Sequence, residues 1–413
     1  MNDVSDPPAV SPDDAAPNAA AEQPAQERLT RFQLYMLAVA SAIVVANAYY
    51  IHPIIALVAE DFGVGAAMIG AVPALNQIAL AVGIFLFLPL GDRFGNGRLA
   101  GIFVAAQFVA VAAMALAGDF RLFVIASTLL GLATIAPYLI PAYVSKRVEP
   151  GRMGSAMAFL TVGIIVGILF ARLGAGLLGE YLGWRTVYYV AAALMLVMAV
   201  ALPRIMGGQR QGAPAPERSY WALLLSTFPI ARRNPDVLLS GAIQGLNFGI
   251  FLSVWLGIGL HLPRIGYGVD TVGYLAGFSI VNLFSTPWLG AWSDRVGAQK
   301  ARLVVASGQL VGIGLLFLSG ESVWVLAVPV LIMNLVGPVI DITGRVTFLS
   351  EAPEIRTRLM TVYIILMFIG GGAASWAGTA AYDLGGWTGT CLLALGLSLS
   401  VLSLSFLAWR RGR

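Results

Sequence analysis

The chain has 413 residues, of which 58% are hydrophobic and 11% charged, and its formal net charge at pH 7 is +4. A soluble domain carries roughly a quarter charged residues, so this composition excludes an ordinary soluble protein and indicates one built for lipid. The positive charges stand between apolar runs rather than in one basic patch. We therefore expect no nucleic-acid partner.

Residues 1–30 are rich in Ala, Pro and Asp and show no helical period. Such a segment cannot bury enough apolar surface to fold, so we expect a disordered cytoplasmic tail. It has neither a positively charged start nor a cleavage pattern, so we do not expect a signal peptide.

Twelve long runs free of Asp, Glu, Lys and Arg follow the tail. Each approaches or exceeds the roughly 17–25 residues that cross a bilayer as a helix. Lipid offers no partner for backbone N–H and C=O groups, which forces helix, and the period of two typical of a barrel is missing. We expect an all-α membrane protein with 12 transmembrane helices, from the runs Phe32–Ala59, Phe62–Gly91, Leu99–Gly118, Leu122–Ser145, Met153–Ala171, Thr186–Pro203, Val237–Pro263, Thr271–Ser293, Leu303–Gly320, Ser322–Ile340, Leu359–Tyr382 and Leu384–Trp409.

The placement of Lys and Arg predicts the orientation, because short cytoplasmic connections collect positive charge. With the N-terminus inside, the inside segments hold 20 Lys and Arg residues, and the outside segments hold only Arg121, Arg185 and Arg264. We therefore expect both termini in the cytoplasm.

Residues 204–235 form the longest polar stretch after the tail, and we interpret them as a cytoplasmic linker between six-helix bundles at 31–203 and 236–413. Duplicated halves should match at a fixed offset. Three pairs do so at 202 or 203 residues: Asp92 with Asp294, Pro150 with Pro353, and Gly183 with Gly386. Parallel repeats of this kind place a substrate site between the halves near the bilayer midplane.

Two polar hairpins, LGDRFGNGRL at 90–99 and LGAWSDRVGAQKARL at 289–303, each join two apolar runs on the expected inner side. Glycine lets the backbone reverse there, and the charged residues need helix ends as partners. Both hairpins resemble the signature loop of the major facilitator superfamily of secondary transporters. The resemblance implies conformational gating by Asp92, Arg93, Gly95, Gly290, Asp294, Arg295 and Gly297.

The same resemblance implies that Asp92 meets the start of the eleventh span and Asp294 the start of the fifth. Glu149, Glu351 and Glu354 are candidate partners for the hairpin arginines. Such contacts exist only while the inner side is shut, so they favour the outward-open state.

Three further segments narrow the resemblance: NAYY at 47–50, ARLGAGLLG at 171–179 and RLMTVY at 358–363. They are similar to segments of bacterial inner-membrane permeases described as arabinose-efflux-like or drug-efflux-like. The resemblance implies a multi-pass protein of the bacterial inner membrane that works by alternating access.

Four ionisable residues inside or beside the spans are candidates for function. Asp341 and Arg345 lie four residues apart on one helix face, with the acid on the favourable N-terminal side. Asp341 either carries protons or organises the inner gate, or it is a satisfied ion pair. Arg172 near the outer end of span five is a functional candidate, although it can also snorkel or pair with Glu180. At about 1.5 Å per residue, Arg172 and Asp341 differ in depth by well over a salt-bridge length.

His52 lies beside Pro53, which should bend or end the first span near the outer surface. His52 is either an interfacial residue beside Tyr49 and Tyr50 or a proton-carrying group at the outer mouth. Its unperturbed pKa of about 6.5 suits the second role.

By resemblance, spans one, four, seven and ten line the central cavity. Its candidate residues are Asn47, Tyr138, Arg172, Gln244, Asn247, Trp255 and Arg345, with Gln77, Asn282 and Asn334 in support. This mostly uncharged, aromatic lining suits a neutral or amphiphilic and fairly apolar substrate. Each Asn or Gln can instead serve a hydrogen bond between helices.

The sequence contains no catalytic constellation, nucleotide fingerprint or metal-ligand spacing, so we expect no enzyme activity, no cofactor and no metal. We predict a proton-coupled antiporter that expels small, mostly apolar compounds and functions as a monomer, with the substrate, protons and the lipid bilayer as its partners. The alternatives are a carrier for one metabolite such as a sugar or organic acid, and a membrane enzyme or receptor without transport.

Overall fold

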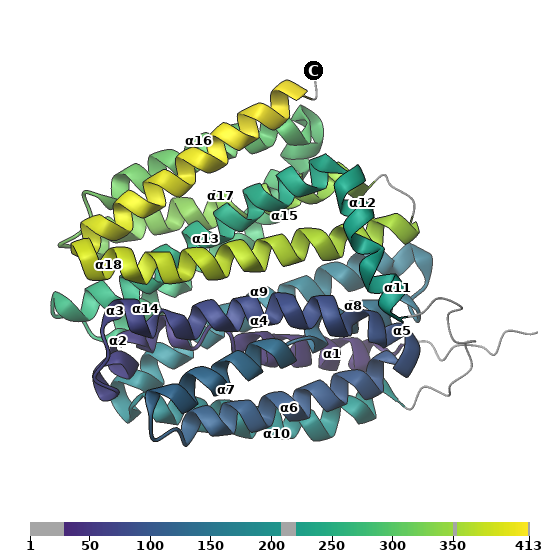
Figure 1. Cartoon of the computed structure of the whole chain (residues 1–413), viewed down its shortest axis with the longest axis horizontal. Helices are drawn as coiled ribbons and strands as arrows, with labels where there is room; N and C mark the ends of the chain where they lie inside the picture. Colours follow the sequence, from purple (N-terminus) through teal and green to yellow (C-terminus); the bar gives the residue numbers. More distant parts are fainter. Residues whose placement is uncertain (1–28, 208–219, 350–352, 412–413) are drawn as a thin grey trace, which may run out of the picture.

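The structure is a computed structural model that describes residues 29–207, 220–349 and 353–411, and this part of the chain is helical. Residues 1–28 of the predicted tail and the central part of the predicted linker lie outside the described residues. Two groups of helices lie side by side, the first in the lower half of Figure 1 and the second in the upper half.

The first group comprises α1 (Arg31–Ala46), α2 (Ile51–Asp61), α3 (Ala66–Ile69), α4 (Ala71–Phe87), η2 (Leu88–Leu90), α5 (Gly91–Phe94), α6 (Asn96–Ala115), α7 (Phe120–Ala133), α8 (Ala136–Ser145), η3 (Pro150–Arg152), α9 (Met153–Leu182) and α10 (Trp184–Met206). The second group comprises α13 (Pro235–Arg264), α14 (Val269–Ala276), η4 (Gly277–Ile280), α15 (Val281–Val296), α16 (Ala298–Leu316), α17 (Val323–Leu349) and α18 (Pro353–Arg411).

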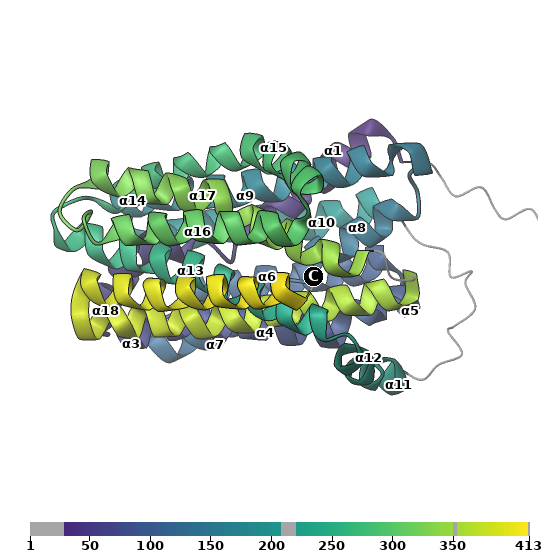
Figure 2. The same cartoon turned by 90° about the horizontal axis from the view of Figure 1, so that it is seen from above.

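Two short helices, α11 (Tyr220–Leu225) and α12 (Thr227–Arg233), precede the second group. Figure 2 shows them at the end of the molecule where α5 lies. We call this the linker end, and the end with α2, α3 and α14 the opposite end. The Tyr220 hydroxyl donates to the carbonyl oxygen of Leu86, which ties α11 to the first group.

The first predicted span is broken, because α1 ends at Ala46 and α2 begins at Ile51. Proline has no N–H group with which to continue the helical ladder, and its ring crowds the preceding turn. The break therefore lies one turn before Pro53 rather than at it, and the His52 N–H donates to the carbonyl oxygen of Tyr49 at 3.3 Å.

Glycines with positive φ reverse the chain at matching positions of the two groups. Gly95 has φ 80° and Gly297 has φ 91°, at the hairpin positions predicted from the sequence. Gly183 has φ 81° and Gly386 has φ 59°. A side chain is disfavoured at such angles, so glycine is required at each reversal. The spacings within the two pairs are the predicted 202 and 203 residues.

Helix α18 is continuous by hydrogen bonding but reverses at Gly386, where φ is 59° and ψ −145°. Figure 1 shows the two arms meeting at the left and diverging toward the right. The reversal separates the two last predicted spans, Leu359–Tyr382 and Leu384–Trp409.

Among the described residues, nine helical stretches are long and apolar enough to cross a membrane, with α18 counted once. Large apolar side chains cover the surface, including Phe284 at 72% and Trp324 at 80% exposed. In water such patches would favour association, but against acyl chains they are satisfied. The protein is therefore an all-helical, multi-pass membrane protein.

Substitution of Gly386 tests the reversal in α18. Gly386→Ala should destabilise the fold by about 1–3 kcal/mol, because that backbone conformation is nearly exclusive to glycine. A Cβ atom there meets no neighbour within 4 Å, so any effect comes from the backbone. The measurement is the thermal unfolding midpoint of the purified protein in detergent.

The matched control is Gly385→Ala, which also adds a methyl group into open space but at a position without positive φ. Equal midpoints for the two variants would contradict a backbone constraint at Gly386.

Candidate functional site

The two groups of helices meet most tightly at the opposite end. A Cβ atom on Gly259 of α13 would overlap the carbonyl oxygen of His52, next to the start of α2. A Cβ atom on Gly176 of α9 would lie 2.8 Å from the carbonyl oxygen of Val269 in α14. Both neighbours are backbone atoms that cannot swing aside, so only glycine permits this approach. The opposite end is closed.

Glu180 strengthens this closure by accepting a hydrogen bond of 2.8 Å from the backbone N–H of Val269, at the first turn of α14. A carboxylate at a helix N-terminus is favourable. The neighbouring Tyr181 hydroxyl donates to Asp270 at 3.3 Å. Glu180 therefore binds the second group and is not the partner of Arg172, so that sequence-based alternative is wrong.

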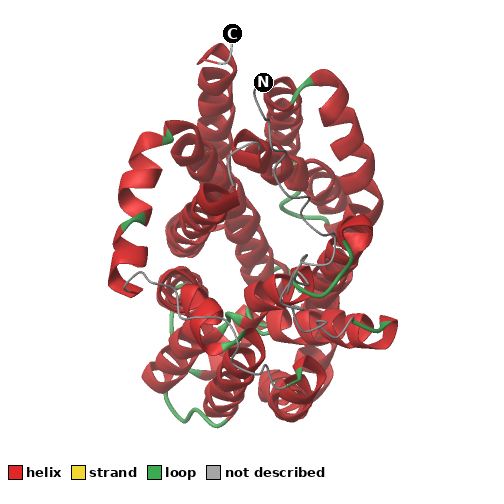
Figure 3. Cartoon of the chain, turned by 90° about the vertical axis from the view of Figure 1, so that its right-hand side faces the viewer, coloured by secondary structure: helices red, strands yellow, loops and turns green. Residues whose placement is uncertain are grey.

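The linker end differs, as the second predicted hairpin shows. Asp294 and Arg295 are exposed, and neither makes a hydrogen bond or ion pair within the described residues. Nearby Phe284 and Trp288 on α15 are also exposed. Figure 3 views the molecule from this end, with the helix ends of the two groups arranged around the middle. The predicted contact between Asp294 and the start of α9 is not formed in this conformation.

The first hairpin can be followed only as backbone, through α5 and the positive φ of Gly95. The side chains of Asp92 and Arg93, and those of the candidate partners Glu351 and Glu354, lie outside the described residues. In the second hairpin, Gly290 lies within α15, where a Cβ atom would only touch Ile342 at 4.0 Å.

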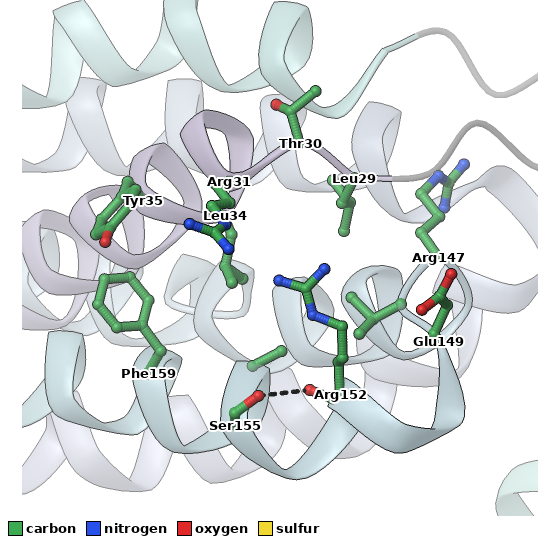
Figure 4. Close-up of a pocket in the computed structure, with 12 residues that line it drawn as sticks. Leu29, Thr30, Arg31, Leu34, Tyr35, Arg147, Glu149, Arg152, Ser155 and Phe159 are labelled. Carbon is green, nitrogen blue, oxygen red and sulfur yellow. Dashed lines mark hydrogen bonds between the residues drawn. The ribbon is translucent and has the colours of Figure 1, made fainter.

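A pocket of about 400 Å³ lies at the linker end within the first group, between the start of α1 and the connection from α8 to α9 (Figure 4). Arg31, Arg147 and Arg152 surround it, together with Glu149. The guanidinium of Arg147 lies 3.9 Å from the centre of the Tyr143 ring. This pocket is distinct from the predicted cavity between the two groups, and its positive charge comes from the start of α1 and from the connection between α8 and α9.

Asp341 and Arg345 form the predicted ion pair. The Nε atom of Arg345 donates to Oδ1 at 3.0 Å and to Oδ2 at 3.1 Å of Asp341. The Tyr363 hydroxyl of α18 donates to the same Oδ1 at 3.0 Å. About a quarter of the Asp341 side chain and a third of the Arg345 side chain remain exposed, at 27% and 33%. The carboxylate is therefore held but accessible.

Tyr363 escaped sequence analysis, because a tyrosine in an apolar run has no spacing relation to an acid 22 residues earlier. Tyr138 of α8 lies on the other side of the interface, within electrostatic range of Asp341 and Arg345. Its ring packs edge-on against Phe368 of α18 at 6.3 Å. Tyr138 is thus the predicted cavity residue that links both groups near the ion pair.

Arg172 is 1% exposed, and the structure gives no hydrogen-bond partner to any of its three guanidinium nitrogens among the described residues. Its guanidinium carbon lies 4.4 Å from the ring centre of Phe251, 4.6 Å from that of Trp255 and 5.4 Å from that of Tyr49. A desolvated cation–π contact contributes about 2 kcal/mol, whereas burying an ion costs several kcal/mol. Arg172 does not pair with Asp341, as the difference in depth predicts. The alternative that Arg172 snorkels is wrong, because its side chain is buried.

His52 is 0% exposed, and neither ring nitrogen has a partner among the described residues. Its ring lies 5.3 Å from that of Tyr49 and within electrostatic range of Arg172. A position at an aqueous outer mouth or at the membrane interface is therefore wrong for this conformation, because the contact between α2 and α13 covers the residue.

Two predicted cavity residues, Asn47 and Asn247, are directed into their own groups instead. The Asn47 Nδ2 atom lies 3.5 Å from Oε1 of Gln107, and Gln309 donates to Oδ1 of Asn247 at 2.8 Å. Gln107 and Gln309 are themselves 202 residues apart. Both asparagines thus make hydrogen bonds between helices, the alternative to a cavity position.

The remaining uncharged candidates differ in their surroundings. Gln244 accepts from Asn247 at 3.1 Å. Asn334 accepts from Ser279 at 3.0 Å. Gln77 and Asn282 each carry a buried side-chain oxygen without a described partner. Trp255 is buried against Arg172.

A closed opposite end, a polar interface between two matched helix groups and a hairpin at the other end are features of a carrier. The family model described as the Major Facilitator Superfamily matches residues 37–352. The chain belongs to the Major Facilitator Superfamily.

Two curated relatives and one solved structure illustrate its place in this superfamily. It is 28% identical over 392 residues to an uncharacterized transporter, YgaY, of Escherichia coli O157:H7, covering 92% of this chain and 95% of the relative. It is 22% identical to the multidrug resistance protein MdtG of Salmonella arizonae over 52% of this chain and 54% of MdtG.

The solved structure is that of a bacterial homologue of the human lysosomal transporter Spinster, in an inward-facing and unoccupied conformation. It shares 13% identity and the same fold, with a TM-score of 0.72 over 92% of this chain and 96% of that chain. The protein is therefore a membrane transporter of the superfamily, whose members carry small molecules through the bilayer and are not enzymes.

The close approach of α9 and α14 predicts the effect of one methyl group. Gly176→Ala should separate the two groups at the opposite end, because the new Cβ atom would meet the backbone of Val269 and Gly273. Spin labels at Leu116→Cys and Leu318→Cys, exposed at that end of the two groups, should report a population at longer distance. The native Cys391 is buried and should not label.

Gly174→Ala is the matched control, since it lies on the same helix and a Cβ atom there meets nothing within 4 Å. A distance distribution that is identical in both variants would show that the contact at Gly176 does not hold the opposite end closed.

Proposed function

We propose that this transporter is a secondary active carrier that works by alternating access and expels small, mostly apolar compounds in exchange for protons. The observation that carries the proposal is the asymmetry of the interface. Close backbone contacts shut one end, and at the other end the Asp294 hairpin stands exposed and unpaired within the described residues. A single interface that closes at one end at a time is what alternating access requires.

The topology of this proposal has 12 transmembrane helices. Nine candidate spans become twelve when the two arms of α18 count separately and when α14–α15 and α16 are added. The excess of Lys and Arg supports a cytoplasmic linker end with both termini inside. The six-helix bundles are then residues 31–203 and 236–413, joined by the linker at 204–235, in a bacterial inner membrane and acting as a monomer.

Under this topology the described conformation is open to the cytoplasm. The Asp92 and Asp294 hairpins then act as reversible clamps, which bind the opposite bundle only when the inner side shuts. Asp294 would cap the start of α9 in that state, with a favourable interaction between carboxylate and helix N-terminus. The absence of this contact here, where the opposite end is closed, agrees with such a cycle.

The coupling group in this proposal is Asp341. It is accessible and lies within electrostatic range of Tyr138 of the first group. Its partners Arg345 and Tyr363 can respond when it gains a proton. An efflux direction is supported by the similarity to MdtG, a multidrug resistance protein. The second candidate function is a carrier for one defined metabolite, such as an organic acid, and the buried cation Arg172 favours it.

Expression in a strain that lacks its main efflux pumps separates the two functions. Protection against several unrelated toxic compounds supports broad efflux. Changed accumulation of one labelled nutrient without any protection would instead establish the single-metabolite carrier. Proteoliposomes that move nothing under any gradient would refute transport altogether.

The role of Asp341 can be tested by removing its proton site while keeping its shape. Asp341→Asn should abolish transport driven by a pH gradient, because the amide can still contact Arg345 and Tyr363 but cannot bind and release a proton. Transport in proteoliposomes with an imposed pH gradient is the measurement. Glu321→Gln, at an exposed carboxylate, is the control and should transport normally. Retained pH dependence in Asp341→Asn would make the ion pair structural.

The clamp at Asp294 has its own consequence. Asp294→Ala should shift the population toward the inward-open state by about two- to fivefold, the equivalent of about 0.3–1 kcal/mol for one helix-terminus contact. Spin labels on Ser145 and Lys300, exposed at the linker ends of the two groups, report the shift. An unchanged distance distribution would mean that Asp294 makes no such contact in the closed state.

A further inference from the structure

Arg172 is the one described guanidinium that is fully buried with all three nitrogens unpartnered. Phe251 and Trp255 of α13 and Tyr49 at the break between α1 and α2 surround it with ring faces. Ring faces attract a cation but accept no conventional hydrogen bond. The N–H donors of the guanidinium therefore make no hydrogen bond within the described residues in this conformation.

No carboxylate of the described chain supplies the missing acceptor. Glu180 lies about two turns after Arg172 on α9, and it binds the backbone N–H of Val269. Asp341 is engaged by Arg345 and Tyr363. Buried charges are normally paired with an opposite charge. An acceptor from outside the chain would complete the site.

His52 adds a second set of unused polar atoms in the same layer. Its two ring nitrogens are buried without a described partner, and its ring contacts that of Tyr49. A purely structural latch would need only the cation and its ring contacts. The Arg172 guanidinium and the His52 imidazole, neither with a described partner, both lie near the Tyr49 ring, and this indicates a polar group that both can bind.

The site draws on both helix groups, because α9 contributes Arg172 and α13 contributes Phe251 and Trp255. An occupant therefore contacts both halves and is sensitive to their relative position. The same layer is sealed by the contacts at Gly259 and Gly176, so an occupant enters or leaves when these contacts separate.

We infer that Arg172 binds the carboxylate of the cargo, and that the cargo is a small organic monocarboxylate with an apolar body. This inference rests on the proposed transport function and specifies its substrate class. The planar guanidinium matches two carboxylate oxygens with two parallel N–H donors. A ring N–H of His52 donates to a remaining lone pair, and the apolar body packs against Phe251 and Trp255.

The test is direct binding to the full-length protein in detergent, with benzoate as the probe and benzamide as its uncharged analogue. Isothermal titration should show saturable binding of benzoate, at least tenfold tighter than that of benzamide. Arg172→Gln should weaken benzoate binding at least tenfold. Arg172→Lys, which keeps the charge but not the two parallel donors, should give an intermediate loss and serves if the glutamine variant does not fold.

Arg302→Lys is the matched control, because Arg302 is also 1% exposed but lies on α16 and donates to Ser240 at 3.2 Å. It should bind benzoate like the native protein. Equal binding of benzoate and benzamide, or full binding in Arg172→Gln, would overturn the inference. So would an Arg172→Lys protein in which only the separation of the two groups changes and benzoate affinity does not, since Arg172 would then hold the two groups together without binding the cargo.

Uptake of labelled benzoate into proteoliposomes separates this inference from the proposed function. Binding without uptake under any gradient leaves the carboxylate site standing and counts against transport. Transport of an uncharged compound that is unaffected by Arg172→Gln supports the proposed function and refutes the carboxylate site.

Discussion

The close backbone contact between the two helix groups at the opposite end is the constraint on which the rest of the structure depends. At Gly259 and Gly176 the neighbouring helix approaches so closely that a β-carbon would collide with main-chain atoms. In lipid there is little hydrophobic force between helices, so van der Waals packing of small residues carries much of their association. The absence of a side chain at these glycines thus lets the two groups pack closely at the opposite end.

Charge in this apolar setting is handled in two different ways. The Asp341–Arg345 pair is neutralised along one helix and held by Tyr363, at a depth where part of each side chain remains accessible. Arg172 is instead enclosed by aromatic rings and left without a hydrogen-bond partner among the described residues. The first arrangement is satisfied as it stands. The buried, unpartnered Arg172 is costly, and it is maintained only by the packing around it. A costly ionisable residue inside a membrane is a functional candidate, so Arg172 is the more informative about function.

The sequence correctly predicts local features such as chain reversals and pairs along one helix. It fails where the rotation of a helix about its axis decides which way a side chain points. Glycine reversals at Gly95 and Gly297, and the i,i+4 pair of Asp341, follow from local rules and are found in the structure. Asn47, a predicted cavity residue, faces Gln107, and Glu180 binds α14 rather than Arg172. In a soluble helix the apolar stripe reveals the buried face. In these spans both the lipid-facing and the interior faces are apolar, so sequence periodicity carries little information about which way a side chain points.

The duplicated amide pairs, Asn47 with Gln107 and Asn247 with Gln309, have a mechanical consequence. Each joins helices within one group, and none bridges the two groups. In an apolar surrounding a broken amide contact finds no water to replace it, so each bundle resists internal shear. The two helix groups should therefore rotate as rigid bodies about their interface. A change in their separation at one end is then coupled directly to a change at the other end.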